Sequence, residues 1–220
     1  MNIENYLIEK IIQNKKYLHP MLVAFDGVDT AGKTFIADKI DIALTKMNFQ
    51  SIRVSIDKFH NSKNIRMKKG EFSPRGYFED SFNLEKIIEL IILPVKNNEK
   101  TIITGIYDYK IEKSIDRREI ELNSQSIILF DGIFMNRNEL FKYWDFSVFL
   151  DVNFENVIKR AIKRDSKLFG NEEEIKFRYL NRYIPGQEIY LNECNPIERA
   201  NIVIDNNDWN NPKLLKENFA

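Results

Sequence analysis

The sequence has little cysteine, histidine or glycine, and these shortages exclude several classes of protein. Its 220 residues include one cysteine, Cys194, so the chain has no internal disulfide and no cysteine metal cluster. Two histidines, His19 and His60, do not make a metal site by themselves. The eight glycines form no linker, and there is no repeat or low-complexity block. A lone cysteine suits a reducing compartment, and we expect a cytoplasmic protein.

The sequence also lacks a net charge and long apolar runs. Its 33 Lys and Arg residues equal its 33 Asp and Glu residues, so no excess charge favours nucleic acid or an anionic membrane. No uninterrupted apolar stretch reaches the roughly 20 residues that span a bilayer. We therefore expect neither nucleic acid nor a membrane as a partner. Helical spacing of apolar residues within 1–19 predicts an amphipathic helix packed on the body, not a secretory signal.

Short apolar runs alternate with helical patterns along the chain. Strands are predicted at 21–25, 51–56, 101–105, 126–130, 146–150 and 201–205, and helices near 33–48, 82–98, 136–143, 153–165 and 172–192. Strands that are apolar throughout are typical of a parallel sheet covered by helices on both faces. The pattern predicts one α/β domain over 1–220, with a three-layer fold and a mostly parallel sheet. Ligands in such folds lie beyond the carboxyl ends of the strands.

The segment GVDTAGKT, residues 27–34, matches the P-loop pattern between a predicted strand and a predicted helix. Glycines let such a loop bend so that its amides converge on phosphate oxygens, and the helix adds its positive end. The alternative is an ordinary glycine-containing turn. Lys33 is predicted to reach the β- and γ-phosphates of ATP, and the Thr34 hydroxyl to bind Mg²⁺. The predicted ATP-binding residues are Gly27, Asp29, Thr30, Ala31, Gly32, Lys33 and Thr34.

Two carboxylates close predicted strands, where ligands are expected. Asp131 ends the run SIILFD, and beside a P-loop it would hold Mg²⁺ through water. The alternative is a turn or capping residue before Gly132. Asp57 ends SIRVSID, and an acid there would accept the proton of an attacking hydroxyl. Periodicity alone leaves an ordinary loop carboxylate equally open for Asp57.

Basic and imidazole side chains follow two of the predicted strands. Arg160 and Arg164 share one helix face at i, i+4 spacing, after the last strongly apolar strand. Arginine suits the charge that develops on a transferred phosphoryl group, although a solvated basic face is the simpler alternative. His60 lies three residues after Asp57 and is a candidate for the acceptor pocket.

Several segments occur in the order and spacing of one family. They are GVDTAGKT, SIDKFH, DSFN, IYDYKIEKSIDRR, IILFDGIF, WDFSVFLDV, RAIKRD, RYIPGQEIY and ERANIVIDN. Over roughly residues 20–207 the chain resembles the uridine kinase and phosphoribulokinase-like group. The resemblance implies a P-loop NTPase fold with a hairpin at about 106–122 and a lid at about 165–180. It also implies transfer of the γ-phosphate of ATP to a small-molecule hydroxyl, with Mg²⁺.

Position by position, the resemblance assigns roles to individual residues. It implies catalytic roles for Asp57, Lys33 and Arg164, and Mg²⁺ binding by Thr34 and Asp131. The residues expected to bind the acceptor are His60, Asp80, Tyr107, Asp108 and Arg160.

Departures from the family pattern fall on the acceptor side and leave three hypotheses. Glu112 stands where these kinases typically have His, Ala161 where they have a second Arg, and the lid is acidic. The first hypothesis is a kinase acting on the 5′-hydroxyl of uridine or cytidine. The second is the same chemistry on another small alcohol, and the third is a non-catalytic, nucleotide-binding regulatory protein. The Phe-rich composition also allows a homo-oligomer, without an interface signature.

Overall fold

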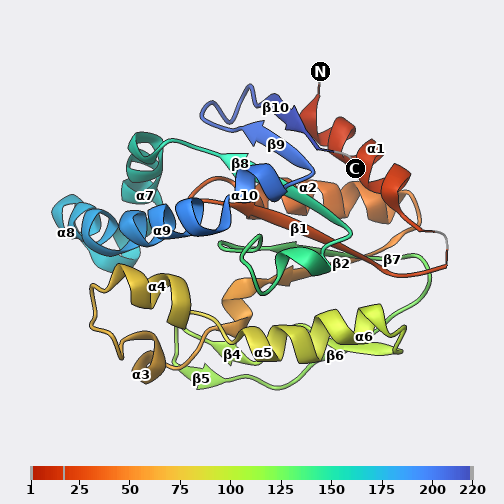
Figure 1. Ribbon diagram of the computed structural model, residues 1–220, viewed down its shortest axis with the longest axis horizontal. Helices are drawn as coiled ribbons and strands as arrows, with labels where there is room; N and C mark the ends of the chain where they lie inside the picture. Colours follow the sequence, from red (N-terminus) through yellow and green to blue (C-terminus); the bar gives the residue numbers. More distant parts are fainter. Residues whose placement is uncertain (1, 17, 219–220) are drawn as a thin grey trace.

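The computed structural model describes residues 2–16 and 18–218, which fold around one six-stranded sheet (Figure 1). The strand order is β10-β9-β8-β1-β7-β2, and all neighbours are parallel except β10 and β9. The strands are β1 Met21–Gly27, β2 Gln50–Ser55, β7 Ser126–Asp131, β8 Phe146–Asp151, β9 Ile202–Asp205 and β10 Lys213–Glu217. The predicted α/β fold with a mostly parallel sheet is therefore confirmed.

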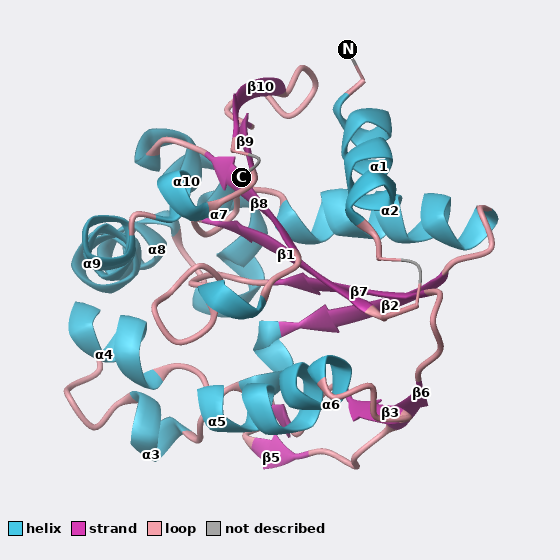
Figure 2. Ribbon diagram, turned by 45° about the vertical axis from the view of Figure 1, so that its right-hand side comes forward, coloured by secondary structure: helices cyan, strands magenta, loops and turns pink. Residues whose placement is uncertain are grey.

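Helices cover both faces of this sheet (Figure 2). They are α1 Ile3–Asn14, α2 Lys33–Lys46, α3 Lys63–Arg66, α4 Pro74–Asp80, α5 Leu84–Ile87, α6 Leu93–Lys96, α7 Phe154–Phe169, α8 Glu172–Arg178, α9 Ile184–Cys194 and α10 Pro196–Arg199. Two π-helical turns, η2 Ile88–Ile92 and η4 Tyr179–Tyr183, join α5 to α6 and α8 to α9, and two 3₁₀ turns are η1 Ile56–Phe59 and η3 Phe141–Tyr143. Across 2–16 and 18–218, none of these helices is long and apolar enough to span a membrane.

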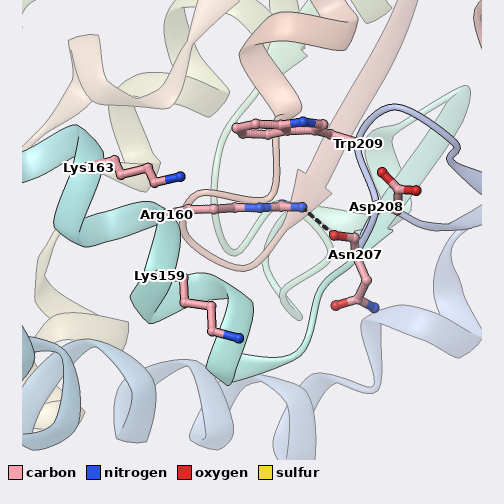
Figure 3. A pocket seen from close by; sticks show the side chains of 6 residues that line it. All are labelled: Lys159, Arg160, Lys163, Asn207, Asp208 and Trp209. Carbon is pink, nitrogen blue, oxygen red and sulfur yellow. Dashed lines mark hydrogen bonds between the residues drawn. The ribbon is translucent and has the colours of Figure 1, made fainter.

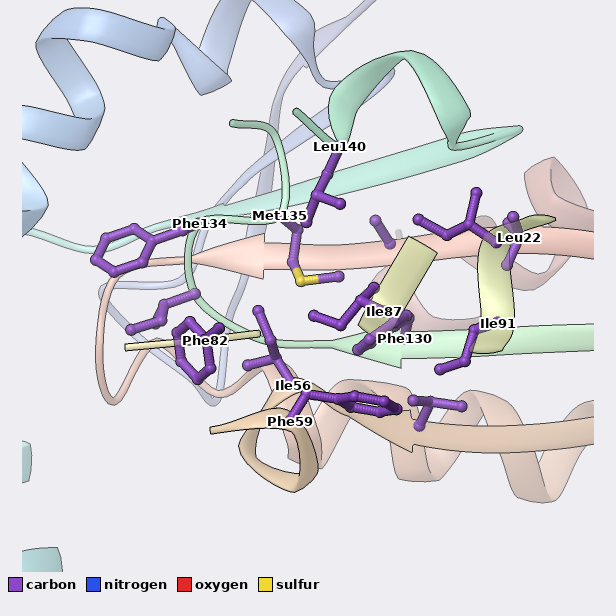
Figure 4. Packing of buried hydrophobic residues seen from close by; sticks show 14 of the residues in the cluster. Leu22, Ile56, Phe59, Phe82, Ile87, Ile91, Phe130, Phe134, Met135 and Leu140 are labelled. Atoms are coloured by element: carbon purple, nitrogen blue, oxygen red, sulfur yellow. The ribbon is translucent and has the colours of Figure 1, made fainter. Parts of the chain in front are cut away.

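The alternating side chains of β1 produce the three layers. Met21, Val23 and Phe25 pack into one cluster with α1 and α2, whereas Leu22 and Ala24 pack into the other with α5, α6 and α9. Figure 4 shows this second cluster from close by. The helix predicted within 1–19 is α1, and Met1 and Tyr17 of that range lie outside the described residues.

The predicted strand at 101–105 is real but lies outside the main sheet. It forms β3, Thr101–Ile103, which pairs antiparallel with β6, Glu119–Glu121. Of its three residues only Ile102 is buried. The apolar run predicts a strand, but it carries no information about which sheet the strand joins. The stretch expected as a hairpin, 106–122, contains β6 and the antiparallel pair β4, Tyr107–Asp108, and β5, Lys113–Ser114.

The predicted helix at 136–143 is wrong apart from the short turn η3. The backbone amide and the side-chain amide of Asn136 both donate to Asp26, at 2.9 and 2.8 Å. The Arg137 guanidinium donates to the backbone carbonyl of Phe78 at 3.0 Å and pairs with Glu139. The long-range contacts with Asp26 and Phe78 hold this segment as turns. Such contacts cannot be detected from the spacing of apolar residues in the sequence.

We predict that Leu22→Ala lowers the free energy of unfolding by about 2–5 kcal/mol, because it leaves a cavity in a packed core. Leu22 is fully buried in the central strand β1. Leu215→Ala is the matched control, since Leu215 on the edge strand β10 is 55% exposed. Urea unfolding of both variants measures the difference. Equal losses in the two variants would contradict this description of the core.

Candidate active site

The loop after β1 has a shape that glycine alone allows at two positions. Gly27 has φ 145°, and a Cβ there would lie 2.5 Å from the backbone oxygen of Leu150. Gly32 has φ 93°, and its Cβ would lie 2.9 Å from the side-chain nitrogen of Asn206. The first residue of α2, Lys33, follows directly, so the unpaired amides of the helix start point into the loop.

Lys33 is buried inside this loop. Its Nζ donates to the carbonyl of Gly27 at 3.1 Å and to that of Val28 at 2.7 Å. Burial lowers the pKa of Lys33, and the nearby carboxylates of Asp29 and Asp26 oppose that change. The ammonium group is therefore held by carbonyls of the loop itself, next to the amides that would receive phosphate.

Two residues that the sequence did not single out fix the middle of the loop. The amide of Asp29 donates to Gln187 Oε1 at 2.6 Å, and the Tyr77 hydroxyl donates to Asp29 Oδ2 at 2.7 Å. On the other side, Asn206 donates to the carbonyl of Ala31 at 2.6 Å. No local pattern identifies Gln187 or Tyr77, which are brought to the loop by α9 and α4.

A buried carboxylate, Asp26, precedes the loop and was also missed. It accepts hydrogen bonds from the amide of Gly27 at 2.7 Å, from both nitrogens of Asn136, and from the Tyr190 hydroxyl. Burial raises the pKa of Asp26, and these donors oppose that rise. The sequence does show an acid at the end of the apolar run MLVAF, but not the donors that surround it.

Thr34 and Asp131 meet at the carboxyl ends of β1 and β7. The Thr34 hydroxyl donates to Asp131 Oδ2 at 2.5 Å, while Oδ1 accepts from Arg53 Nη2 at 2.8 Å. Hydroxyl and carboxylate oxygens are suitable Mg²⁺ ligands, so the residues fit that ion. In the described part of the chain no group of three or more His, Cys, Asp or Glu side chains could hold a metal. The remaining ligands would therefore be water and phosphate.

Asp57 lies in the 3₁₀ turn that follows β2, close to the same site. Its side chain is 55% exposed. Partial desolvation raises the pKa of Asp57; His60 opposes this rise, while the charges of Asp29 and Asp131 add to it. Ser55 at the end of β2 pairs in register with Asp131, so Asp57, two residues further on, lies at the same edge of the sheet as Asp131. Strand β7 lies between β2 and β1, so Asp57 is separated from the P-loop strand by one strand.

His60 lies beside Asp57, as expected. Its Nδ1 is 3.0 Å from the carbonyl oxygen of Asp57, and its ring packs between Phe82 and Tyr109 at centroid distances of 4.6 and 4.5 Å. Burial lowers the pKa of His60, against the effect of Asp57. The structure thus places Tyr109, which the sequence reasoning did not choose, next to these two residues.

The neighbouring hairpin residues make other contacts. The Tyr107 hydroxyl donates to Glu112 at 2.9 Å, and Glu112 also pairs with Arg66. Asp108 accepts only a local bond, from the amide of Lys110 at 2.9 Å, among the hydrogen bonds of the described residues. Tyr107 and Glu112 therefore form one polar cluster at the hairpin.

Asp80, expected to contact the acceptor, is buried and paired with two lysines. Lys68 Nζ lies 2.9 Å from Oδ1, and Lys69 Nζ lies 3.0 Å from Oδ2. Desolvation would raise the pKa of Asp80, but the two lysines hold it below its usual range. Its carboxylate thus ties α4 to the preceding loop.

Arg164 lies on α7 and pairs with the buried carboxylate of Asp165, while its own side chain is 55% exposed. Its Nε and Nη2 donate to the Asp165 carboxylate at 2.6 and 3.0 Å, and Nη2 also donates to the Tyr179 hydroxyl at 2.9 Å. Burial alone would lower the pKa of Arg164, but the pairing with Asp165 raises it. The predicted lid at 165–180 comprises the end of α7, the turn at Gly170, and α8.

Arg160, predicted to bind the acceptor, contacts the P-loop and the turn after β9. Its guanidinium donates to the carbonyls of Thr30, Asn206 and Asn207, at 3.2, 2.6 and 2.9 Å. It also stacks on Trp209, 5.3 Å from the ring centroid (Figure 3). Arg160, Asn207 and Trp209 line a pocket of about 180 Å³, and none of the contacts of Arg160 reaches Asp57. Arg160 thus links α7 to the P-loop and to the turn after β9.

A phosphate loop after the central strand, with acidic residues at neighbouring strand ends, defines a P-loop α/β protein. A family model described as the phosphoribulokinase / uridine kinase family matches residues 22–210. The chain belongs to this family.

The known proteins that are similar to this chain have names that refer to different substrates. Pantothenate kinases of Streptococcus pyogenes are 25% identical over 171 residues, covering 73% of this chain. The match covers 55% of their length, so the chain spans about half the length of the curated relatives that it matches.

Solved structures share the fold. A structure described as a possible uridine kinase from Bacillus stearothermophilus has a TM-score of 0.73 and 20% identity, covering 91% of this chain and 96% of its own. A D-glycerate 3-kinase from Cryptococcus neoformans has a TM-score of 0.65 and 11% identity, covering 98% of this chain and 100% of its own.

We predict that Gly27→Ala abolishes binding of ATP, because the new Cβ would meet the fixed backbone oxygen of Leu150 and distort the loop. Gly70→Ala is the control for left-handed backbone strain, since Gly70 has φ 103° and open space around it. Calorimetric titration with a non-hydrolysable ATP analogue compares the two variants. Retained affinity in Gly27→Ala would refute the assignment of this loop.

Proposed function

We propose that this protein is an ATP-dependent kinase that transfers the γ-phosphate to a hydroxyl of a small molecule. The observation that carries the proposal is the convergence of three parts at one edge of the sheet: the P-loop with Lys33, the Thr34–Asp131 pair, and Asp57, which follows the register pair of Ser55 and Asp131. Membership of a kinase family supports it.

On the donor side, loop amides and Lys33 would bind the β- and γ-phosphates, replacing the carbonyl contacts that Lys33 now makes. Thr34 and Asp131 would hold Mg²⁺, which when bound neutralises charge on the phosphate oxygens. Arg164, fixed by Asp165, would stabilise the charge that develops on the transferring group. The pocket around Arg160 and Trp209 lies where the rest of the nucleotide would extend.

On the acceptor side, Asp57 would take the proton of the attacking hydroxyl. The hydroxyl oxygen forms a bond to the γ-phosphorus, the bond from that phosphorus to the β,γ-bridging oxygen breaks, and ADP leaves. The raised pKa of Asp57 lies closer to neutral pH, and it makes the carboxylate a stronger base than that of an ordinary aspartate. His60, held against the Asp57 carbonyl, would keep the turn in place.

For the acceptor we propose the 5′-hydroxyl of uridine or cytidine. Aromatic side chains beside Asp57, namely His60, Phe82 and Tyr109, support a planar group in the pocket. The likeness to a structure described as a possible uridine kinase agrees with this choice.

A second candidate is another small alcohol, and the Glu112 cluster favours it. Glu112 is held by Arg66, by the Tyr107 hydroxyl and by the amide of Lys63 at 3.1 Å, while Asp80 is neutralised by two lysines. Polar groups already paired in this way are poor partners for the edge of a base. Relatives named for pantothenate and glycerate show that this fold accommodates other acceptors.

We predict that Asp57→Asn reduces phosphoryl transfer by about 10²-fold or more, because the general base is lost. Affinity for the ATP analogue should change little, since Asp57 lies outside the P-loop. Asp41→Asn, on α2, is the control for loss of a carboxylate. Steady-state rates and calorimetry test both expectations, and undiminished transfer in Asp57→Asn would remove this residue from the mechanism.

A panel of acceptors tests the function itself. Uridine, cytidine, other nucleosides, pantothenate, glycerate and ribulose 5-phosphate are each incubated with Mg²⁺-ATP, and ADP release and product mass are measured. We expect a monophosphate from uridine or cytidine, and no product with Lys33→Met. Turnover of another alcohol alone would establish the second candidate, whereas ATP binding without any turnover would favour a regulatory protein.

A further inference from the structure

Arg53 lies beside the proposed magnesium ligands and has no role in the mechanism above. It belongs to β2, where it pairs in register with Leu129 of β7. Its guanidinium donates in three directions: Nη1 to the Leu129 carbonyl at 2.9 Å, Nη2 to Asp131 Oδ1 at 2.8 Å, and Nε to Asp38 at 2.9 Å. Three fixed acceptors leave this side chain little freedom to move.

The Asp131 carboxylate is divided between two partners. Oδ1 faces Arg53, and Oδ2 accepts the proton of the Thr34 hydroxyl at 2.5 Å. A threonine hydroxyl has one proton and two lone pairs, so its lone pairs remain available once Asp131 holds the proton. The bond from Arg53 to Oδ1 therefore holds the carboxylate with Oδ2 beside the Thr34 hydroxyl.

We infer that Arg53 is a positioning residue, which orients Asp131 so that Oδ2 and the Thr34 hydroxyl present a fixed pair of oxygens to Mg²⁺. The inference rests on the proposed function. Charge-assisted bonds from a guanidinium fork are strong and directional, and partners behind a metal-binding carboxylate commonly set its orientation. The side chain of Asp131 is 4% exposed, so no water competes effectively for the bond to Arg53.

Arg53 also lies at a surface that solvent and ligands can reach. Thr34, Asp38, Arg53 and Asp131 share the wall of a pocket of about 350 Å³. The guanidinium is therefore part of the site wall as well as a link between α2, β2 and β7. A purely structural link would affect the fold and nucleotide binding as a whole, whereas a positioning role would affect the contribution of Mg²⁺ alone.

The experiment compares the dissociation constant of ADP with and without Mg²⁺, by calorimetry on the full chain. In the wild type, Mg²⁺ should tighten binding. In Arg53→Met this tightening should shrink about tenfold, while Mg²⁺-free binding stays the same. Arg53→Lys should lie between them, because it keeps the charge but loses the fork. Arg75→Met is the matched control, since Arg75 is an exposed arginine paired with Glu193 and Glu79.

Paramagnetic resonance of Mn²⁺ added with ADP provides a second readout, independent of turnover, and should show weaker Mn²⁺ retention in Arg53→Met. If that variant does not fold, Arg53→Lys is measured in the same way. Equal tightening by Mg²⁺ in wild type and variants, or equal weakening with and without Mg²⁺, overturns the inference. No Mg²⁺ effect in the wild type would instead overturn the proposed function itself, and the inference with it.

Discussion

The buried carboxylate of Asp26 is the interaction on which the site depends. A carboxylate removed from water must be surrounded by donors, and here the donors come from three separate parts of the chain. Gly27 begins the P-loop, Asn136 lies after β7, and Tyr190 lies on α9. Satisfying one buried group therefore fixes the start of the phosphate loop relative to the segments around it. The bonds from Asn136 to Asp26 also explain why residues 132–137 form turns and not a helix.

Around that point, the donor half of the site is built mainly from backbone and the acceptor half mainly from side chains. The backbone conformation of the P-loop follows from steric rules that can be read from the sequence. Glycine, for example, stands at two positions with positive φ. Near Asp57, by contrast, the charged groups are already engaged with one another, as Glu112 is with Arg66 and Asp80 is with Lys68. These ion pairs involve no residue of the P-loop.

The features of the fold that could be predicted from the sequence are those that local residue patterns determine. Strands β1, β7 and β8 are mostly apolar, so their place in a sheet covered on both faces could be inferred, and the Gly-x-x-x-x-Gly-Lys-Thr spacing located the loop. The antiparallel edge strand β10 was missed because its pattern, KLLKE, is short and charged. Neither the pairing of β3 with β6 nor the position of Arg160 could be predicted, because both depend on which distant segment supplies the partner.

Within the site, the sequence indicated Asp57 and His60, and the resemblance added Tyr107 and Asp108, but neither indicated Tyr109, which packs on His60. Tyr109 follows the short strand β4 and lies in the turn after it, where spacing alone does not fix the direction of a side chain. Arg53 escaped notice for a different reason. An arginine within a strand is an ordinary surface residue until the neighbouring strand places a carboxylate beside it.

The contacts of Lys33 with its own loop have a consequence for the energetics of ligand entry. The loop satisfies its most buried cation internally, so it holds its shape before any phosphate arrives. Entry of a ligand then exchanges one set of oxygen partners for another and orders little additional chain, which keeps the entropic cost of association low. The loop is thus preorganised for its ligand. Its preference for phosphate comes from Lys33, which is attracted more strongly to a charged phosphate oxygen than to a neutral carbonyl oxygen.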